Sequence, residues 1–205
     1  MGFIKKVYFL FSIMLAATLL FVFVCMEERR INKWQLKYWP ILIIAIVVLI
    51  TIEILLFCVT SISRSWPTNI ILLVIFTICF AYLVGFICYF YEPLDVFIAL
   101  LVAVSGFIAM TIYGFFTQFD ITVFWSVLFG ASIALLVLCI ILIFVSCKPL
   151  FIFVCILGIT LGLIYVAYDT QLIIGGRKYE LSEDDYIPAA MMLFVDFMTI
   201  FLYAL

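Results

Sequence analysis

Seven long apolar runs alternate with short polar segments along the chain. Each run has roughly the 20 residues that an α-helix needs to cross the hydrocarbon core of a bilayer. The predicted spans are residues 7–26, 38–62, 68–91, 96–116, 123–146, 150–174 and 187–205. Because the connections are short, successive helices should be antiparallel neighbours. The pattern therefore predicts an all-α membrane protein, with residues 1–205 in a single integral membrane domain.

Polar residues between the runs indicate where particular helices begin and end. Residues 27–37 are rich in charge and are expected to form a solvated loop. Gly175 and Gly176 follow the sixth run and suit a left-handed helix cap. The stretch Ser182–Asp185 has the form of a capping box, which predicts a last helix starting near Glu183. The sequence stops while still apolar, so we expect that a short polar tail is missing from it.

The composition agrees with a lipid environment. Hydrophobic residues make up 70% of the chain and charged residues 11%, whereas roughly half of a soluble domain is apolar. The first run follows two lysines, as in a signal peptide, but it is too long for one and no small-residue cleavage site follows it. Basic residues divide five to each side of the membrane, so they do not determine the orientation. No basic tract points to a nucleic acid partner.

The chain has no histidine and seven cysteines, none of them in a CxxC pair. The absence of histidine excludes imidazole metal sites and histidine-based catalysis. We interpret the cysteines as small apolar residues of a buried core, in preference to a disulfide or metal framework. We therefore expect no resident cofactor and no enzymatic activity.

Three acids lie inside the apolar runs: Glu53, Asp169 and Asp196. An ionisable group at that depth costs several kcal/mol unless it is protonated, paired or wetted. Asp169 should lie about 8 Å and Asp196 about 13 Å below the same membrane surface, at 1.5 Å per residue. The two carboxyls can therefore meet inside the membrane, where they would share a proton and form a proton-controlled latch or a cation site. Alternatively, each is simply protonated or hydrogen-bonded and has no function.

Glu53 and Arg64 are eleven residues apart, which is about three helical turns and places both on one face of the second span. Arg64 would then be able to pair with the ionised member of the aspartate pair and hold the bundle shut. The alternative is that Arg64 extends to the membrane interface.

Several sequence motifs resemble those of one known family. They are WPTNIILL at 66–73, AYLVG at 81–85, TQFD at 117–120, YDTQLIIGG at 168–176, YELSEDDYI at 179–187 and LFVD at 193–196. Together they are similar to the Lifeguard branch of the transmembrane Bax inhibitor motif proteins. The likeness covers nearly the whole chain from Phe3, although the proline-rich N-terminal segment of that family is not among these 205 residues.

The resemblance implies six helices around a central C-terminal seventh. It implies a pH-sensitive calcium leak that suppresses apoptosis and is gated by Asp169 and Asp196, which would also hold a permeating Ca²⁺ transiently. The family's latch residues match Arg64 and Glu53. The implied location is the ER or Golgi, with the plasma membrane as an alternative. The implied partners are the lipid bilayer, calcium ions and membrane proteins that regulate cell death.

Three other functions come into question for a polytopic chain with buried acids. An aspartyl intramembrane protease places aspartates on similar helices but needs Gly-x-Gly-Asp, where this chain has the bulkier LFVD at 193–196. Against a retinal or peptide receptor, the last helix has no lysine for a Schiff base and the loops are too short for a ligand-binding face. A non-conducting scaffold that acts only through protein partners is not distinguished from a leak channel by the sequence.

Overall fold

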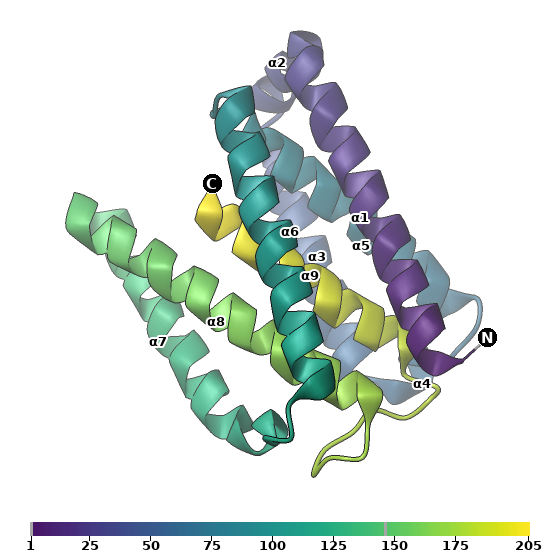
Figure 1. Cartoon of the computed structure of the whole chain (residues 1–205). Helices are drawn as coiled ribbons and strands as arrows, with labels where there is room; N and C mark the ends of the chain where they lie inside the picture. Colours follow the sequence, from purple (N-terminus) through teal and green to yellow (C-terminus); the bar gives the residue numbers. More distant parts are fainter. Residues whose placement is uncertain (1, 146) are drawn as a thin grey trace. The chain divides into compact units, whose positions relative to one another are not determined.

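Long runs of apolar residues form nearly all of the helices in the computed structural model (Figure 1). The structure describes residues 2–145 and 147–205, except for the side chains of Arg29 and Asn32. No strand occurs among the described residues. The elements are α1 (Phe3–Glu27), α2 (Arg29–Lys37), α3 (Pro40–Cys58), α4 (Thr60–Ser63), α5 (Thr68–Cys88), α6 (Pro93–Phe116), η1 (Ile121–Phe124), α7 (Trp125–Phe144), α8 (Lys148–Ile174) and α9 (Tyr186–Ala204).

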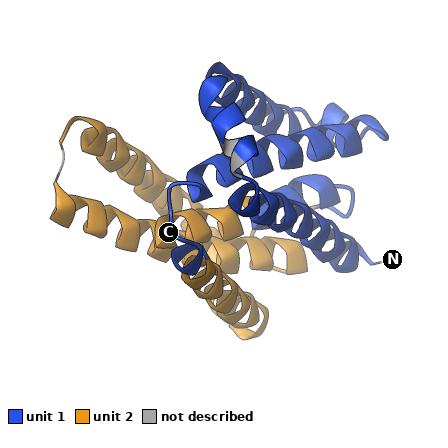
Figure 2. Ribbon diagram, turned by 90° about the horizontal axis from the view of Figure 1, so that it is seen from above, with its two compact units in different colours: residues 1–96, 182–194 blue, residues 97–181, 195–205 orange. Residues whose placement is uncertain are grey.

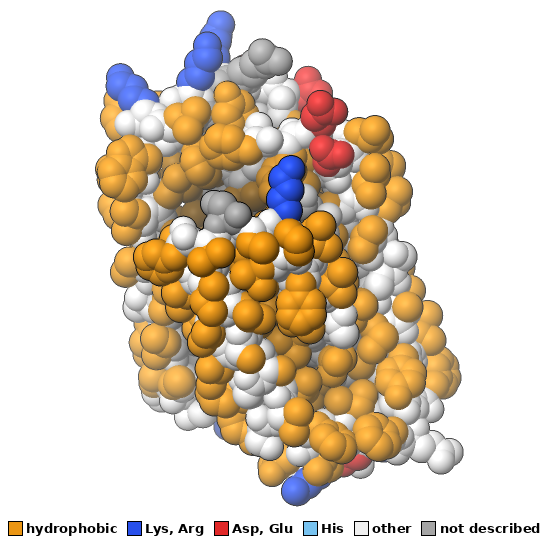
Figure 3. Space-filling model, turned by 90° about the vertical axis from the view of Figure 1, so that its left-hand side faces the viewer, with side chains coloured by type: hydrophobic (Ala, Val, Ile, Leu, Met, Phe, Trp, Pro, Cys, Tyr) orange, Lys and Arg blue, Asp and Glu red, His pale blue; other side chains and the backbone are white. Residues whose placement is uncertain are grey.

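Seven of the described segments are long and apolar enough to cross a membrane. They are α1, α3, α5, α6, the combined η1 and α7, α8, and α9. Apolar side chains cover most of the face drawn in Figure 3, and charged side chains gather toward its top and bottom. Such an apolar surface suits lipid and not water. The prediction of an all-α protein with seven membrane helices is confirmed.

The second predicted span is interrupted. The helix α3 ends at Cys58, Val59 leaves the helical conformation (φ −115°, ψ 84°), and the short α4 follows. Val59 is β-branched and is followed by threonine and serine, whose side chains compete for backbone hydrogen bonds. Glu53 and Arg64 therefore do not lie on one unbroken helix. The argument that eleven residues place them on one face was wrong.

The segment expected as the first polar loop is the helix α2. Within it Gln35 is completely buried, and its Nε2 donates to the backbone O of Tyr82 on α5 at 3.2 Å. The other described side chains of α2, apart from the partly exposed Ile31, are exposed. This long-range hydrogen bond thus helps to hold in place a helix whose local sequence is mostly charged and polar.

The helix α8 ends at Ile174, as predicted, and both glycines after it have positive φ angles of 77° and 71°. Gly175 combines its φ with a ψ of −172°, a region of backbone conformation that is nearly restricted to glycine. The glycine pair therefore directs the chain away from the helix end. The fifth predicted span ends on Ser146, which lies outside the described residues.

The last helix starts at Tyr186, later than predicted. The hydroxyl of Ser182 donates to Oδ2 of Asp185 at 2.7 Å, and the backbone N–H of Asp185 donates to the O of Ser182. The Ser182 side chain thus bonds another side chain instead of the backbone N–H groups of a helix that starts beside it. The predicted start near Glu183, with Ser182 as the cap, was wrong.

The chain divides into two compact units (Figure 2). Unit 1 comprises residues 1–96 and 182–194, and within it α5 packs against both α1 and α3. Unit 2 comprises residues 97–181 and 195–205, and within it α7 packs against α8 while η1 contacts both. The helix α9 contributes its first half to unit 1 and its second half to unit 2. The single membrane domain stays a prediction.

The helix α9 is the most enclosed of the seven spans. In its most apolar stretch 67% of residues are buried, against 11–33% in the other six. Ala189 and Ala190 are fully buried, as expected for small residues that permit close packing. The arrangement of six helices around this one stays a prediction.

Candidate functional site

Asp169 on α8 and Asp196 on the second half of α9 come together within unit 2. Their residues are only 4% and 8% exposed, and the two carboxyl groups lie within hydrogen-bonding reach of each other. Among the described residues no donor reaches Oδ1 of Asp169 or Oδ2 of Asp196. A carboxylate can only accept hydrogen bonds, so the two groups bond each other only when one carries a proton. The geometry therefore suits a pair that shares one proton.

Two glycines of α8 allow this close approach of α9. A Cβ added to Gly162 would lie 2.9 Å from Cγ1 of Ile200, and one added to Gly158 would overlap the ring of Tyr203. As the residue number rises along α8, from Gly158 to Gly162, the contacted residue number falls along α9, from Tyr203 to Ile200. The two helices are therefore antiparallel here, and the same series leads on to Asp169 and Asp196. The glycines form the motif GxxxG, which is typical of closely packed membrane helices. The sequence contained this signal at residues 158–162, and our sequence analysis missed it.

The helix α6 packs closely on α8 beside Asp169. A Cβ on Gly114 would lie 3.0 Å from Cβ of Thr170 and 3.1 Å from the backbone O of Ala167. Thr170 is itself fully buried, and its Oγ1 donates to the backbone O of Val166 at 2.6 Å. The residues that flank Asp169 are thus held by close backbone and side-chain contacts, which restrict the rotation of this part of α8.

The residue that follows Asp196 packs against α6. Phe197 lies edge-on against Phe107 of α6, with ring centroids 5.7 Å apart. Edge-to-face pairs of this kind are favourable and bury large apolar areas. This contact holds the second half of α9 against α6 within unit 2.

A polar cluster lies in unit 2 between the connection that follows α6 and the loop that follows α8. The Thr122 hydroxyl and backbone N–H donate to Oδ1 of Asp120, and the backbone N–H of Lys178 donates to Oδ2. These hydrogen bonds, the one from the Thr122 hydroxyl foremost, hold the pKa of Asp120 below its ordinary value. Asp120 therefore links the connection between α6 and α7 to the loop after α8.

Arg64 pairs with Asp185 within unit 1. Its Nε and Nη2 donate to the two carboxylate oxygens, both at 2.9 Å, and Nη2 also donates to the Ser182 hydroxyl at 2.9 Å. The hydrogen bond from Arg64 lowers the pKa of Asp185, and the pKa of Arg64 is raised in turn. Bidentate pairs of this kind are strong and well oriented. The partner predicted from the sequence was the aspartate pair, and the structure places Asp185 there instead.

The remaining candidate, Glu53 on α3, is half-buried and has no ion-pair partner among the described residues. Arg64 and Glu53 belong to unit 1, whereas the aspartate pair belongs to unit 2. The role of Arg64 and Glu53 as a latch on that pair stays a prediction.

The aspartate pair offers few ligands for a resident metal ion. Among the described residues no group of three or more His, Cys, Asp and Glu side chains gathers as a metal site. Calcium normally takes about six to eight oxygen ligands. Two carboxylates alone therefore suit a passing ion better than a tightly held one.

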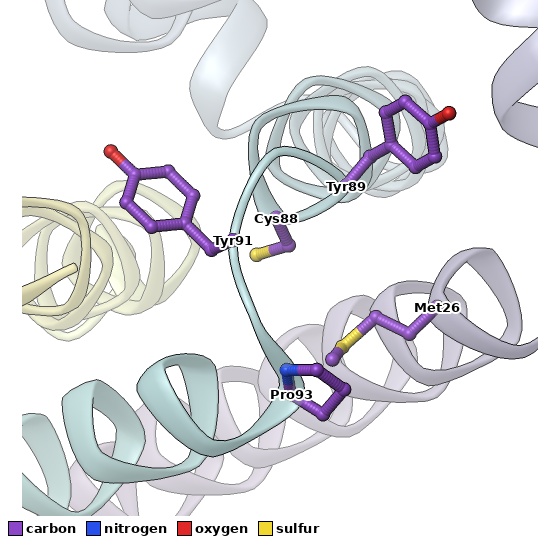
Figure 4. Close-up of a pocket in the computed structure, with 5 residues that line it drawn as sticks. All are labelled: Met26, Cys88, Tyr89, Tyr91 and Pro93. Atoms are coloured by element: carbon purple, nitrogen blue, oxygen red, sulfur yellow. The ribbon is translucent and has the colours of Figure 1, made fainter.

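A hollow of about 370 Å³ lies in unit 1 at the ends of α1 and α5 (Figure 4). The residues that line it are Met26, Cys88, Tyr89, Tyr91 and Pro93. The described residues of its lining include no acidic or basic side chain, and Asp169 and Asp196 belong to the other unit. The hollow therefore does not form part of the aspartate site.

Comparison with known proteins identifies the family. The family model "Inhibitor of apoptosis-promoting Bax1" matches residues 1–205. Protein lifeguard 3 from Mus musculus is 30% identical over 208 residues, covering the whole chain and 67% of the relative. The human protein of the same name is 30% identical over 99% of the chain and 67% of its own length. Protein LIFEGUARD 4 from Arabidopsis thaliana is 32% identical, over 98% of this chain and 81% of its own length. The chain therefore belongs to the Bax inhibitor motif family, as a multi-pass integral membrane protein similar to the Lifeguard proteins.

Proposed function

We propose that this protein is a calcium leak channel of an intracellular membrane whose opening depends on the proton shared by Asp169 and Asp196. The observation that carries the proposal is the carboxyl pair itself, which is buried within two candidate membrane spans, with no donor from the described residues to Oδ1 of Asp169 or Oδ2 of Asp196. Buried acids in membrane helices are expensive and commonly mark ion pathways or proton relays. A purely structural position in these helices would be filled more cheaply by an apolar residue.

The proton count of the pair can change the conformation of the bundle. Losing the shared proton places two negative charges side by side in a dry site and creates an attractive position for a divalent cation. Gaining a second proton leaves two neutral acids that hydrogen-bond each other. Either change can bias a two-state equilibrium by a few kcal/mol, which shifts an open population by tens- to hundreds-fold.

The cellular role in the proposal is the suppression of cell death. The name of the family model refers to inhibition of apoptosis-promoting Bax1, and neither it nor the relatives' names refers to catalysis. A slow calcium leak from the ER or Golgi would limit the calcium that those stores can release. Membrane proteins that regulate cell death are the proposed partners.

The test is calcium flux through purified protein in liposomes across a range of pH. Asp169→Asn and Asp196→Asn should each flatten the pH dependence of flux without unfolding the protein, because an amide can neither gain nor lose the proton. Asp95→Asn is the matched control, since Asp95 is an exposed acid in the first turn of α6. Its pH profile should match that of the wild type.

Two results would contradict the proposal. If both Asn variants of the pair keep the wild-type pH profile, the pair is structural and does not gate. If the wild-type protein passes no calcium at any pH, the non-conducting scaffold becomes the better function.

A further inference from the structure

The connection between α6 and α7 is fastened to the end of α8. Five hydrogen bonds join them within unit 2. Gln171 supplies two, the guanidinium of Arg177 supplies two to backbone carbonyls, and the backbone N–H of Lys178 supplies one to Asp120. Two of the five therefore come from one side chain inside the helix, and the other three come from the loop beyond it.

Gln171 is the buried member of this set, at 1% exposure. Its Oε1 accepts from the backbone N–H of Ile121 and its Nε2 donates to the backbone O of Phe119, both at 2.8 Å. An amide side chain accepts through one end and donates through the other, which a carboxylate or an apolar residue cannot do. Removing the amide would leave a buried N–H and a C=O unpaired.

Gln171 lies two residues after Asp169 on α8. The segment from 167 to 171 is thus held by α6, through Gly114, and by the 117–121 connection, through Gln171. A slip of one residue along the helix axis is about 1.5 Å. Since hydrogen bonds between carboxyl groups need their oxygens about 2.5–3.0 Å apart, such a slip would break the contact with Asp196.

We propose that Gln171 is a positioning residue for the aspartate pair: its amide fixes α8 against the 117–121 connection and thereby holds the carboxyl of Asp169 in register with that of Asp196. The consequence for ion flux rests on the proposed function, but the positioning itself does not. Among the described residues the hydrogen bonds of the Gln171 side chain go to Ile121 and Phe119, and it acts on the carboxyl pair through the helix that carries Asp169.

The charged groups around Gln171 are few. On its own helix there is Asp169, on the facing part of α9 there is Asp196, on the 117–121 connection there is Asp120, and the loop after α8 carries Arg177, Lys178 and Glu180. Residues 97–116 and 121–144, which supply α6, η1 and α7 to this unit, contain no Asp, Glu, Lys or Arg. If a substitution of Gln171 has a pH-dependent effect, only these few charged groups can be its cause.

The first measurement is hydrogen exchange of the peptide 117–124 in the purified full chain. Gln171→Ala should speed its exchange about tenfold or more, because two hydrogen bonds are lost. Gln118→Glu, a control at an exposed position of the same connection, should leave the exchange within about twofold of the wild type. If Gln171→Ala does not change the exchange of this peptide, the proposed attachment is wrong.

Gln171→Glu keeps the test decisive if the alanine variant does not fold. A protonated glutamic acid can accept from Ile121 and donate to Phe119, as the amide does, whereas an ionised one cannot donate. The ratio of its exchange rate to that of the wild type at the same pH, for the 117–124 peptide, should then be near one in acid and should rise with pH. A ratio that is the same at every pH would overturn the proposal.

The second measurement is an infrared titration of the Asp169–Asp196 carboxyls, identified by their loss in the Asn variants. Gln171→Ala should move the midpoint by about one pH unit, the equivalent of one lost hydrogen bond. Gln118→Glu should not move it. If exchange of the 117–124 peptide speeds up but the titration midpoint of the carboxyl pair does not change, Gln171 holds only the connection. The positioning role is then wrong. Neither measurement uses ion flux, so an inactive wild-type protein would contradict the proposed function and leave this inference standing.

Discussion

The three acids of the membrane spans differ in their surroundings, although the sequence marked all of them in the same way. Asp169 and Asp196 face each other, whereas Glu53 is half-buried and unpaired among the described residues. Arg64 found its partner in Asp185 at the start of α9. At the scale of single residues, the ion-pair partner of a charged side chain depends on which loop lies next to it in space. The hydrophobic periodicity of the sequence does not predict that neighbour.

The pair of Arg64 and Asp185 should make the start of α9 sensitive to acid. The folded state lowers the pKa of Asp185, so the pair's stabilisation is present above the ordinary aspartate pKa and is lost as pH falls through the lowered one. We expect the protection of residues 182–190 from hydrogen exchange, corrected for the intrinsic pH dependence of amide exchange, to fall in acid. Asp185→Asn should give low protection at neutral pH as well.

Asp184→Asn is the matched control for that pair, because Asp184 is exposed and next to Asp185. It should keep both the protection at neutral pH and its loss in acid. If Asp185→Asn behaves like Asp184→Asn, the ion pair does not hold the start of α9.

The predicted role of Arg64 as a latch on the pair of Asp169 and Asp196 has its own test. If Arg64 holds that pair, Arg64→Ala should raise the basal calcium leak. An unchanged leak at every pH would favour a side chain that only reaches the interface.

Among the elements, α8 decides the geometry of the candidate site. Its glycines let the second half of α9 approach, and its neighbour α6 comes close at Gly114. The helix also bears Asp169 and Gln171 on one rigid segment. A helix transmits a local shift along its axis. A change in packing at Gly158 should therefore also shift the carboxyl of Asp169, which lies about three turns further along α8.

Adding one methyl group to α8 should destabilise the protein. In Gly158→Ala the new Cβ would overlap the ring of Tyr203, whose hydroxyl lies 3.5 Å from Sγ of Cys139. Overpacking of this kind costs about 1–3 kcal/mol. The variant should therefore unfold at a lower temperature than the wild type in detergent.

Gly130→Ala on α7 is the control, because a Cβ there meets nothing within 4 Å. Alanine is the better helix former by roughly 0.5–1 kcal/mol, so this variant should be as stable as the wild type or slightly more so. Equal melting temperatures for the two variants would show that α8 and α9 do not pack as closely as described.

On the scale of the whole molecule, the seven spans differ widely in how much of each is enclosed. The helix α9 is the most buried, and η1 with α7 is the least, at 11%. Near its end α7 exposes Ile143 and Phe144 almost completely. The least enclosed helix is therefore the one that should meet lipid tails most extensively, and α9 the one that should meet them least.

Carbene labelling from a lipid-soluble diazirine, read by mass spectrometry, should show this difference in the unmodified protein. Peptides of α7 should be labelled heavily and peptides from α9 weakly, since the label reacts with side chains that face hydrocarbon. The peptide containing Asp196 should be among the weakest. Labelling of that peptide at the level of the α7 peptides would contradict both the enclosed position of α9 and the proposed gate.

The sequence by itself determined the number of spans, the membrane setting, the end of α8 and the two aspartates. The thickness of the bilayer sets the length of a membrane-spanning apolar helix. Ionisable residues inside such a helix are rare, so Asp169 and Asp196 are easily recognised in the sequence. Only the tertiary structure decided the helix α2, the partner of Arg64 and the attachment through Gln171. The contacts of Gln35, Gln171 and Arg64 join residues 47, 50 and 121 positions apart. Such contacts depend on which segments meet in space, and no local pattern of apolar and polar residues carries that information.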